Sequence, residues 1–150
     1  MSDAADAQFT TEELLSSAQG NATAFVLATI AYLKEHDLAV DDYVRFFGSK
    51  FAPGWEELRG RPVTDVAREA ALNVVSVGGT LRSLSGDDTS AEVLIAGWPE
   101  EESLSDLQLT QSDGDRLWNA FGPIMEYLGI RYAWQREGEA VRMTFEMERP

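Results

Sequence analysis

Residues 22–33 read ATAFVLATIAYL, a stretch in which ten of the twelve residues are apolar and none is charged. As a helix this stretch is far too short to cross the roughly 30 Å hydrocarbon core of a bilayer, so we expect it to be buried in protein. Its apolar side chains fall on more than one side of the helical wheel, and one sheet face would not cover them all. We therefore predict a central helix that other helices or a second subunit cover, with Phe25 in the core.

The composition suits one compact domain that avoids anionic partners. The chain has 150 residues, 44% of them hydrophobic, which predicts a single domain over residues 9–150 after a disordered tail at 1–8. Twenty-six acidic residues against twelve basic residues give a formal net charge of −14. Because this charge repels phosphate backbones and anionic headgroups, we expect neither nucleic acid nor a membrane as a partner.

The residue types also restrict the chemistry and the compartment. The chain contains no cysteine, which excludes disulfides, thiolate nucleophiles and cysteine-ligated metal sites. Its first eight residues, MSDAADAQ, lack the basic and apolar regions of a secretory signal peptide. We therefore expect a cytoplasmic protein.

Helix signals fill the first half of the chain. Thr10 and Glu13 have the spacing of a capping box, which predicts that a helix begins here and extends to residue 36. Residues 11–36 are either one helix with a weak point or two consecutive helices, and we favour one bent helix. Residues 40–51 have a second amphipathic pattern, and small apolar residues at helical spacing over 62–77 predict a third helix.

Two hairpins and a further helix complete the predicted fold. Residues 80–96 and 130–147 alternate in the manner of antiparallel strand pairs. Between them, Ser112 and Asp115 have capping-box spacing ahead of an apolar helical pattern that Gly129 ends. This order predicts an α+β domain, with a four-stranded, largely antiparallel sheet from two hairpins packed against about four helices on one face.

Part of the chain resembles known small-molecule-binding proteins. WEELRGRP at 55–62 leads into a helix, a hairpin ends in Gly97-Trp98-Pro99, and a helix is followed by a final hairpin over 129–147. Over about residues 55–147 this order is similar to domains of the 4-vinyl reductase type and to aminothiazoline-carboxylate hydrolase-like proteins. The resemblance implies a shell of sheet and helices around a pocket for a small hydrophobic or carboxylate ligand. Those families often place Cys before this Pro and in the last hairpin, whereas this chain has Trp98 and no Cys, so thiol or metal chemistry is not implied.

The sequence has no strong catalytic signature. His36, its single histidine, follows a predicted helix without partners for acid–base or metal chemistry. Acidic residues at 56–57, 87–88 and 100–102 fit a surface, a turn and a solvated loop better than metal ligation. We therefore predict no catalytic residue, no metal site and no cofactor.

Aromatic residues carry the remaining functional signal, because ligand pockets are largely apolar with a few polar groups. We predict a noncatalytic small-molecule-binding or sensory domain whose pocket is lined by Tyr32, Phe47, Trp55, Trp98 and Tyr132. At the point where the resembling families place a Cys, Trp98 either lies at the mouth or floor of this pocket and presents its ring and its N–H group to the ligand, or fills the former pocket and becomes part of the core.

Two alternatives stay open. The first is a cofactor-free, hydrolase-like enzyme that uses carboxylates, which requires titratable groups that converge in a cleft. The second is a dimeric protein-interaction module, a homo-oligomer that pairs through residues 22–33 or through the apolar stripe at 63–77.

Overall fold

The structure, a computed structural model, describes residues 8–149, so all but the last residue of the predicted tail at 1–8 lies outside it. It confirms an α+β fold in which two hairpins form a four-stranded antiparallel sheet. In chain order the elements are α2 (Thr11–Glu35), α3 (Val40–Phe51), the 3-10 helix η1 (Ala52–Leu58), α4 (Val63–Val75), β1 (Thr80–Gly86), β2 (Ser90–Ala96), α5 (Glu101–Asp106), α6 (Gln111–Asp115), the 3-10 helix η2 (Arg116–Ala120), α7 (Phe121–Leu128), β3 (Ile130–Glu137) and β4 (Ala140–Met147).

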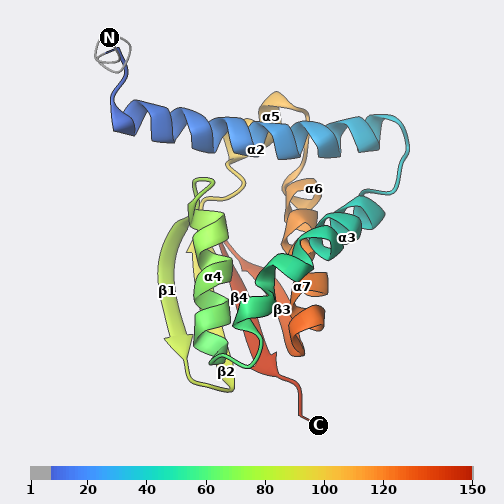
Figure 1. The fold of residues 1–150 in the computed structure, drawn as a ribbon. Coiled ribbons are helices and arrows are strands. Elements are labelled where there is room, and N and C mark those ends of the chain that lie inside the picture. Colours follow the sequence, from blue (N-terminus) through green and yellow to red (C-terminus); the bar gives the residue numbers. More distant parts are fainter. Residues whose placement is uncertain (1–7, 150) are drawn as a thin grey trace, which may run out of the picture.

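The sheet has the strand order β1-β2-β4-β3, and each neighbouring pair is antiparallel. Its inner face is apolar, because Val93 on β2 lies beside Met143 on β4, and both are fully buried. On the same face Phe145 on β4 pairs with Tyr132 on β3. Helix α4 packs on β1, β2 and β4, and α7 packs on β3, so these helices cover one face of the sheet (Figure 1).

The predicted apolar stripe over 62–77 forms the inner side of α4. Six of its residues are at most 4% exposed: Val63, Val66, Ala67, Ala70, Ala71 and Val74. They join Ile95, Val141 and the inner residues of the sheet in the larger of the hydrophobic clusters. Because most of these side chains are small, α4 lies close to the strands. This packing positions the end of the sheet at which β1 begins.

Helix α2 is one element of 25 residues, as favoured from the sequence, and Thr10 and Glu13 form the predicted capping box. Its buried residues are Thr23, Leu27, Ile30 and Ala31, and the last three pack with Val44, Leu104 and Leu109 in a second hydrophobic cluster. The helix crosses one end of the protein, and its first turns extend beyond the elements below it (Figure 1). Among the described helices, none has both the length and the hydropathy needed to cross a membrane.

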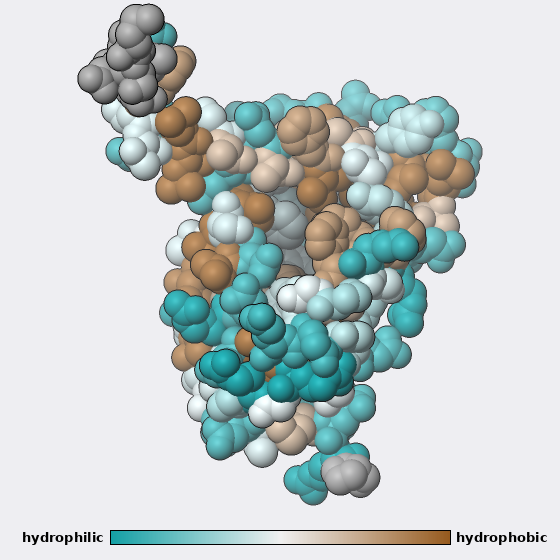
Figure 2. Space-filling model, viewed as in Figure 1, coloured by the Kyte–Doolittle hydropathy of each residue, from teal (hydrophilic) through white to brown (hydrophobic). Residues whose placement is uncertain are grey.

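The predicted central position of α2 is wrong. Phe25, expected in the core, is 76% exposed. One side of α2 packs on α3, α5 and α6, while the main core forms elsewhere, between α4 and the sheet. Hydrophobic side chains therefore remain at the surface along α2 and beside it over α3 (Figure 2).

The predicted helix ahead of Gly129 is interrupted, since η2 separates α6 from α7. The capping box uses Thr110 and Asp113 rather than Ser112 and Asp115. Asp115 is buried at 9% exposure, and its carboxylate makes an ion pair inside the protein instead of capping a helix. Gly129 ends α7 in the left-handed conformation at φ 73°, as its position after the apolar pattern predicted.

Candidate functional site

The structure separates the five aromatic residues that were predicted to line one pocket. Tyr32 is exposed on α2 and stacks on His36, with 4.1 Å between the ring centroids. Phe47 lies on α3 between Tyr43 and Phe51, which it contacts at centroid distances of 6.4 and 4.7 Å. Both rings thus pack mainly on neighbours close to them in sequence.

Trp55, Tyr132 and Trp98 pack around the main core, and each borders a different cavity. The hydroxyl of Tyr132 donates to the carbonyl oxygen of Trp118 at 2.9 Å, and burial raises the pKa of this hydroxyl above its usual value. The ring of Trp55 meets Phe121 edge to face. The cavity beside Trp98 is lined by two arginines, whereas those beside Tyr132 and Trp55 are lined by one each.

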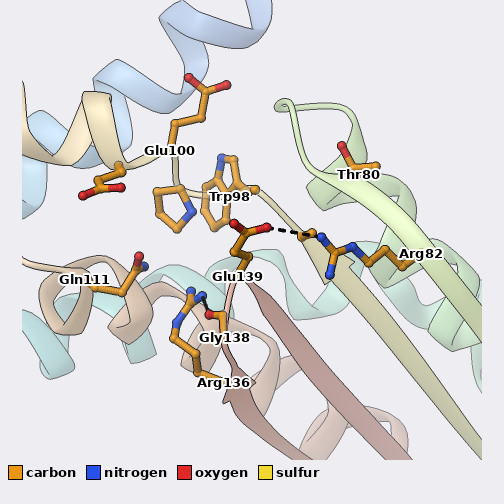
Figure 3. A pocket seen from close by; sticks show the side chains of 12 residues that line it. Thr80, Arg82, Trp98, Glu100, Gln111, Arg136, Gly138 and Glu139 are labelled. Atoms are coloured by element: carbon orange, nitrogen blue, oxygen red, sulfur yellow. Dashed lines mark hydrogen bonds and ion pairs between the residues drawn. The ribbon is translucent and has the colours of Figure 1, made fainter.

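This cleft of about 500 Å³ opens at one end of the sheet (Figure 3). Antiparallel pairing brings its walls together, because Thr80 at the start of β1 and Ala140 at the start of β4 both lie opposite Ala96 at the end of β2. The loop after β2 and the start of α6 close the remaining sides. The side chains that line the cleft include Thr80, Arg82, Trp98, Pro99, Glu100, Glu101, Gln111, Arg136 and Glu139.

Arg136 is held in the cleft by the buried carboxylate of Asp115. Its Nε and Nη2 atoms donate to the two carboxylate oxygens at 2.7 and 2.6 Å, and Nη1 donates to the carbonyl oxygen of Gly138 at 3.1 Å. Gln111 donates to the same carboxylate at 3.1 Å. A guanidinium has five N–H groups, so the remaining donors of Arg136 are free for a bound molecule.

Arg82 is held much less firmly than Arg136. Its Nη2 atom lies 3.5 Å from Oε2 of Glu139, and the two side chains are 47% and 88% exposed. An exposed ion pair at this distance contributes little to stability, because water competes for both groups. A carboxylate from solution can therefore replace Glu139 on Arg82 at little cost.

Trp98 supplies the apolar wall of the cleft and also connects it to α2. Its Nε1 atom donates to Oγ1 of Thr23 at 3.1 Å, and the Thr23 hydroxyl donates to the carbonyl oxygen of Val77 at 3.0 Å. The expectation that Trp98 offers a free N–H group to a ligand is therefore wrong. Its ring packs edge to face on Trp118 at 5.6 Å and remains partly exposed beside the cleft.

Glu56, beside Trp55, does not have the electrostatics of an acid catalyst. Arg59 makes hydrogen bonds to the carboxylate of Glu56, and these bonds, with a further one from Tyr127, hold the pKa of Glu56 below its usual value. A general acid requires a raised pKa. Within residues 8–149, no three acidic or histidine side chains come together as a metal site.

Among the residues of the cleft, Trp98 is predicted from the sequence, whereas Arg82, Arg136, Gln111 and Glu139 are not. The two arginines lie on strands with alternating patterns, where a polar residue is normally assigned to the solvent side. The signal that was available is the position of Arg136 in the same alternation as Tyr132, since that places it on the inner face of β3.

Comparisons with known proteins add no family to this description, because no protein-family model and no curated protein matches the chain. The resemblance to domains of the 4-vinyl reductase type and to aminothiazoline-carboxylate hydrolase-like proteins stays a prediction.

Proposed function

We propose that this protein binds a small organic carboxylate with an apolar body in the cleft beside Trp98, without catalysing a reaction. The observation that carries the proposal is the loose contact between Arg82 and Glu139, at 3.5 Å between exposed side chains. The carboxylate of Glu139 occupies the position beside this guanidinium where the carboxylate of a ligand would bind. A ligand can therefore displace Glu139 and pair with Arg82 without disturbing the core.

The proposed ligand lies across the cleft, with its carboxylate near Arg82 and the free donors of Arg136. Its apolar body contacts the ring of Trp98 and the side chain of Pro99. Glu100 points away from the two arginines, as Figure 3 shows, and so leaves this path open. Three glutamates against two arginines in the lining disfavour ligands with several negative charges, such as phosphate esters.

A binding or sensory role fits this arrangement better than the hydrolase alternative. The buried carboxylate of Asp115, which does not line the cleft, accepts hydrogen bonds from both Arg136 and Gln111 and so serves to position these two side chains. A sensory role has a structural basis in the contact between Trp98 and Thr23, because this contact joins the cleft to α2.

Isothermal titration with phenylacetate, and with phenylacetamide as the uncharged control, tests the proposal. A probe of about ten non-hydrogen atoms binds with a Kd on the order of 1 mM when each atom contributes about 0.4 kcal/mol. We expect Glu139→Gln to bind phenylacetate more tightly, because the internal competitor is removed. Arg82→Gln should weaken binding at least about fivefold, the loss of one charge-assisted contact.

The matched control is Arg131→Gln, because Arg131 is similarly exposed and forms an ion pair with Glu146 away from the cleft. This variant should bind phenylacetate like the unchanged protein. Equal binding of phenylacetamide and phenylacetate, or unchanged affinity in Arg82→Gln, would rule out the proposed carboxylate site.

A further inference from the structure

The side of α2 that faces away from the rest of the protein carries a second apolar stripe. Its members recur at alternating spacings of four and three residues, the heptad pattern of paired helices: Leu14, Ala18, Asn21, Phe25, Ala28 and Tyr32. All six are exposed, and Leu14, Phe25 and Tyr32 are exposed by 58%, 76% and 56%. The buried side of α2, with Leu27 and Ile30, lies on the other side of the helical wheel.

This outer side has a composition that does not suit contact with water. No charged residue occurs between Glu13 and Lys34, although the whole protein has a net charge of −14. A helix that is solvated on one side normally carries charged residues there. Residues 11–18 are exposed without exception, and isolated helical turns have little stability of their own.

We propose that a second copy of this chain covers the stripe, and that the two α2 helices pack antiparallel around a twofold axis midway between Asn21 and Phe25. The stripe is complementary to itself in this register, as an isologous contact requires. The opposed pairs are Leu14 with Tyr32, Ala18 with Ala28, and Asn21 with Phe25. The small alanine pairs let the helices approach closely, and the polar Asn21 helps to fix the register.

Charge favours the antiparallel orientation over the parallel one. The first turn of α2 contains Glu12 and Glu13, whereas its last turn contains both Lys34, which also pairs with Asp113, and Glu35. In the antiparallel pair the acidic turn of each copy therefore lies beside the less acidic end of the partner helix. A parallel pair would place four glutamates together and would also align the helix dipoles unfavourably.

The exposed apolar area is large enough for such a dimer. Three large residues of the stripe, Leu14, Phe25 and Tyr32, are more than half exposed, and Phe9 and Leu15 flank its first turn with similar exposure. At about 100 Å² each, and with the smaller stripe residues between them, these side chains bury at most on the order of 500–800 Å² per copy. Stable interfaces bury about 800 Å² per partner, so we expect a dimer that dissociates at micromolar concentration.

Sedimentation velocity from about 1 to 100 µM covers this range and tests for the dimer. The unchanged protein should be dimeric at the highest concentration, and Phe25→Glu should weaken the dimer at least tenfold. The matched control is Phe46→Glu on α3, which is 58% exposed, adds the same charge and should leave the dimer unchanged. Circular dichroism of both variants confirms that each is folded. A monomer at 100 µM, or equal effects of the two variants, overturns the proposal.

Cross-linking tests the orientation of the two helices. Because the chain has no native cysteine, the cross-linker reacts at the introduced cysteine. Leu14→Cys and Tyr32→Cys are prepared separately, one with a size tag, mixed, and treated with a short bismaleimide. The antiparallel pair gives a mixed product and no product from either variant alone. A product of Leu14→Cys with itself indicates a parallel pair and overturns the proposed orientation, and the absence of every product overturns the proposed helix contact.

Discussion

The hydrogen bond from Trp98 to Thr23 connects the loop after β2 to α2. Thr23 is 5% exposed, and its hydroxyl both accepts from Trp98 and donates to the carbonyl oxygen of Val77. Thr23→Val keeps the shape of the side chain but leaves the indole N–H and this carbonyl oxygen without their partner. We expect the free energy of unfolding in urea to fall by about 1–2 kcal/mol.

Thr29→Val on the same helix is the control for this prediction. The Thr29 hydroxyl donates to the carbonyl oxygen of Phe25 one turn earlier, at an exposed position. Losing that bond should change the free energy of unfolding by less than about 0.5 kcal/mol, because water takes its place. Equal effects of the two substitutions would show that the contact of Thr23 with Trp98 has no special role.

At the scale of single residues, the sequence predicts burial well for a helix with one apolar side and poorly for a stretch that is apolar on more than one side. The stripe on α4 is buried as predicted, because one side of that helix is apolar and the other side contains charged residues. Residues 22–33 are apolar on several sides, so the pattern does not show which side contacts the rest of the chain. Phe25 was placed in the core for this reason.

Among the elements, α3 and η2 make an unusually close approach at Gly48. A Cβ atom at this position would lie against the carbonyl oxygen of Ala120 and close to Pro123. Gly48→Ala should therefore lower the free energy of unfolding by about 1–3 kcal/mol through overpacking, despite the higher helix propensity of alanine. Thermal unfolding measures the effect.

Gly20→Ala is the matched control for this steric prediction. Gly20 lies inside α2, and a Cβ atom there would have no neighbour within 4 Å. We expect this substitution to stabilise the protein by about 0.5–1 kcal/mol, since it lowers the entropy that the chain loses on folding. A stabilising Gly48→Ala would contradict the packing of α3 on η2.

The ion pair between Lys34 at the end of α2 and Asp113 on α6 makes the contact between these elements sensitive to acid. Nζ of Lys34 lies 2.7 Å from Oδ2 of Asp113. Burial raises the pKa of Asp113, but hydrogen bonds from Lys34 and from the amide and hydroxyl of Thr110 outweigh it and hold this pKa below its usual value. The contribution of Asp113 to stability is therefore complete above about pH 4 and is lost as the pH falls through the folded-state pKa.

Urea unfolding between about pH 7 and pH 3 checks this dependence in the unchanged protein and in Asp113→Asn. The difference in unfolding free energy between the two proteins should be largest near neutral pH and should shrink below about pH 4. A difference that keeps its full size at pH 3 would contradict the assigned role of Asp113.

At the scale of elements, periodicity and capping signals predicted most of the fold. Both hairpins, the helices over 11–35, 40–51 and 63–75, and the end of α7 at Gly129 follow local rules of the chain. The region 111–128 does not, because Asp115 has capping-box spacing with Ser112 but forms a buried ion pair with Arg136 instead. The sequence pattern does not distinguish this box from the one formed by Thr110 and Asp113, and the ion pair between distant segments decides between them.

At the scale of the whole molecule, the cleft could not be predicted from the sequence, because the residues that form its walls are far apart in the chain. Arg82, Trp98, Gln111 and Arg136 lie in four different segments, and the strand order β1-β2-β4-β3 brings them to one end of the sheet. Of these residues, Trp98 had a local signal, through its place at the end of a predicted strand. Helix α2 crosses the same end, and it carries both the proposed dimer face and Thr23, the hydrogen-bond partner of Trp98 (Figure 1).

The most direct test of the carboxylate site is a titration of ¹⁵N-labelled protein with phenylacetate, followed through the indole N–H signals in nuclear magnetic resonance spectra. The four tryptophans are Trp55, Trp98, Trp118 and Trp134, and Trp98 is the one that lines the cleft. We predict that the Trp98 signal shifts most and that the signals of Trp55 and Trp134 stay in place. A larger shift of Trp55 or Trp134, or no shift of Trp98 at saturating phenylacetate, would contradict the site.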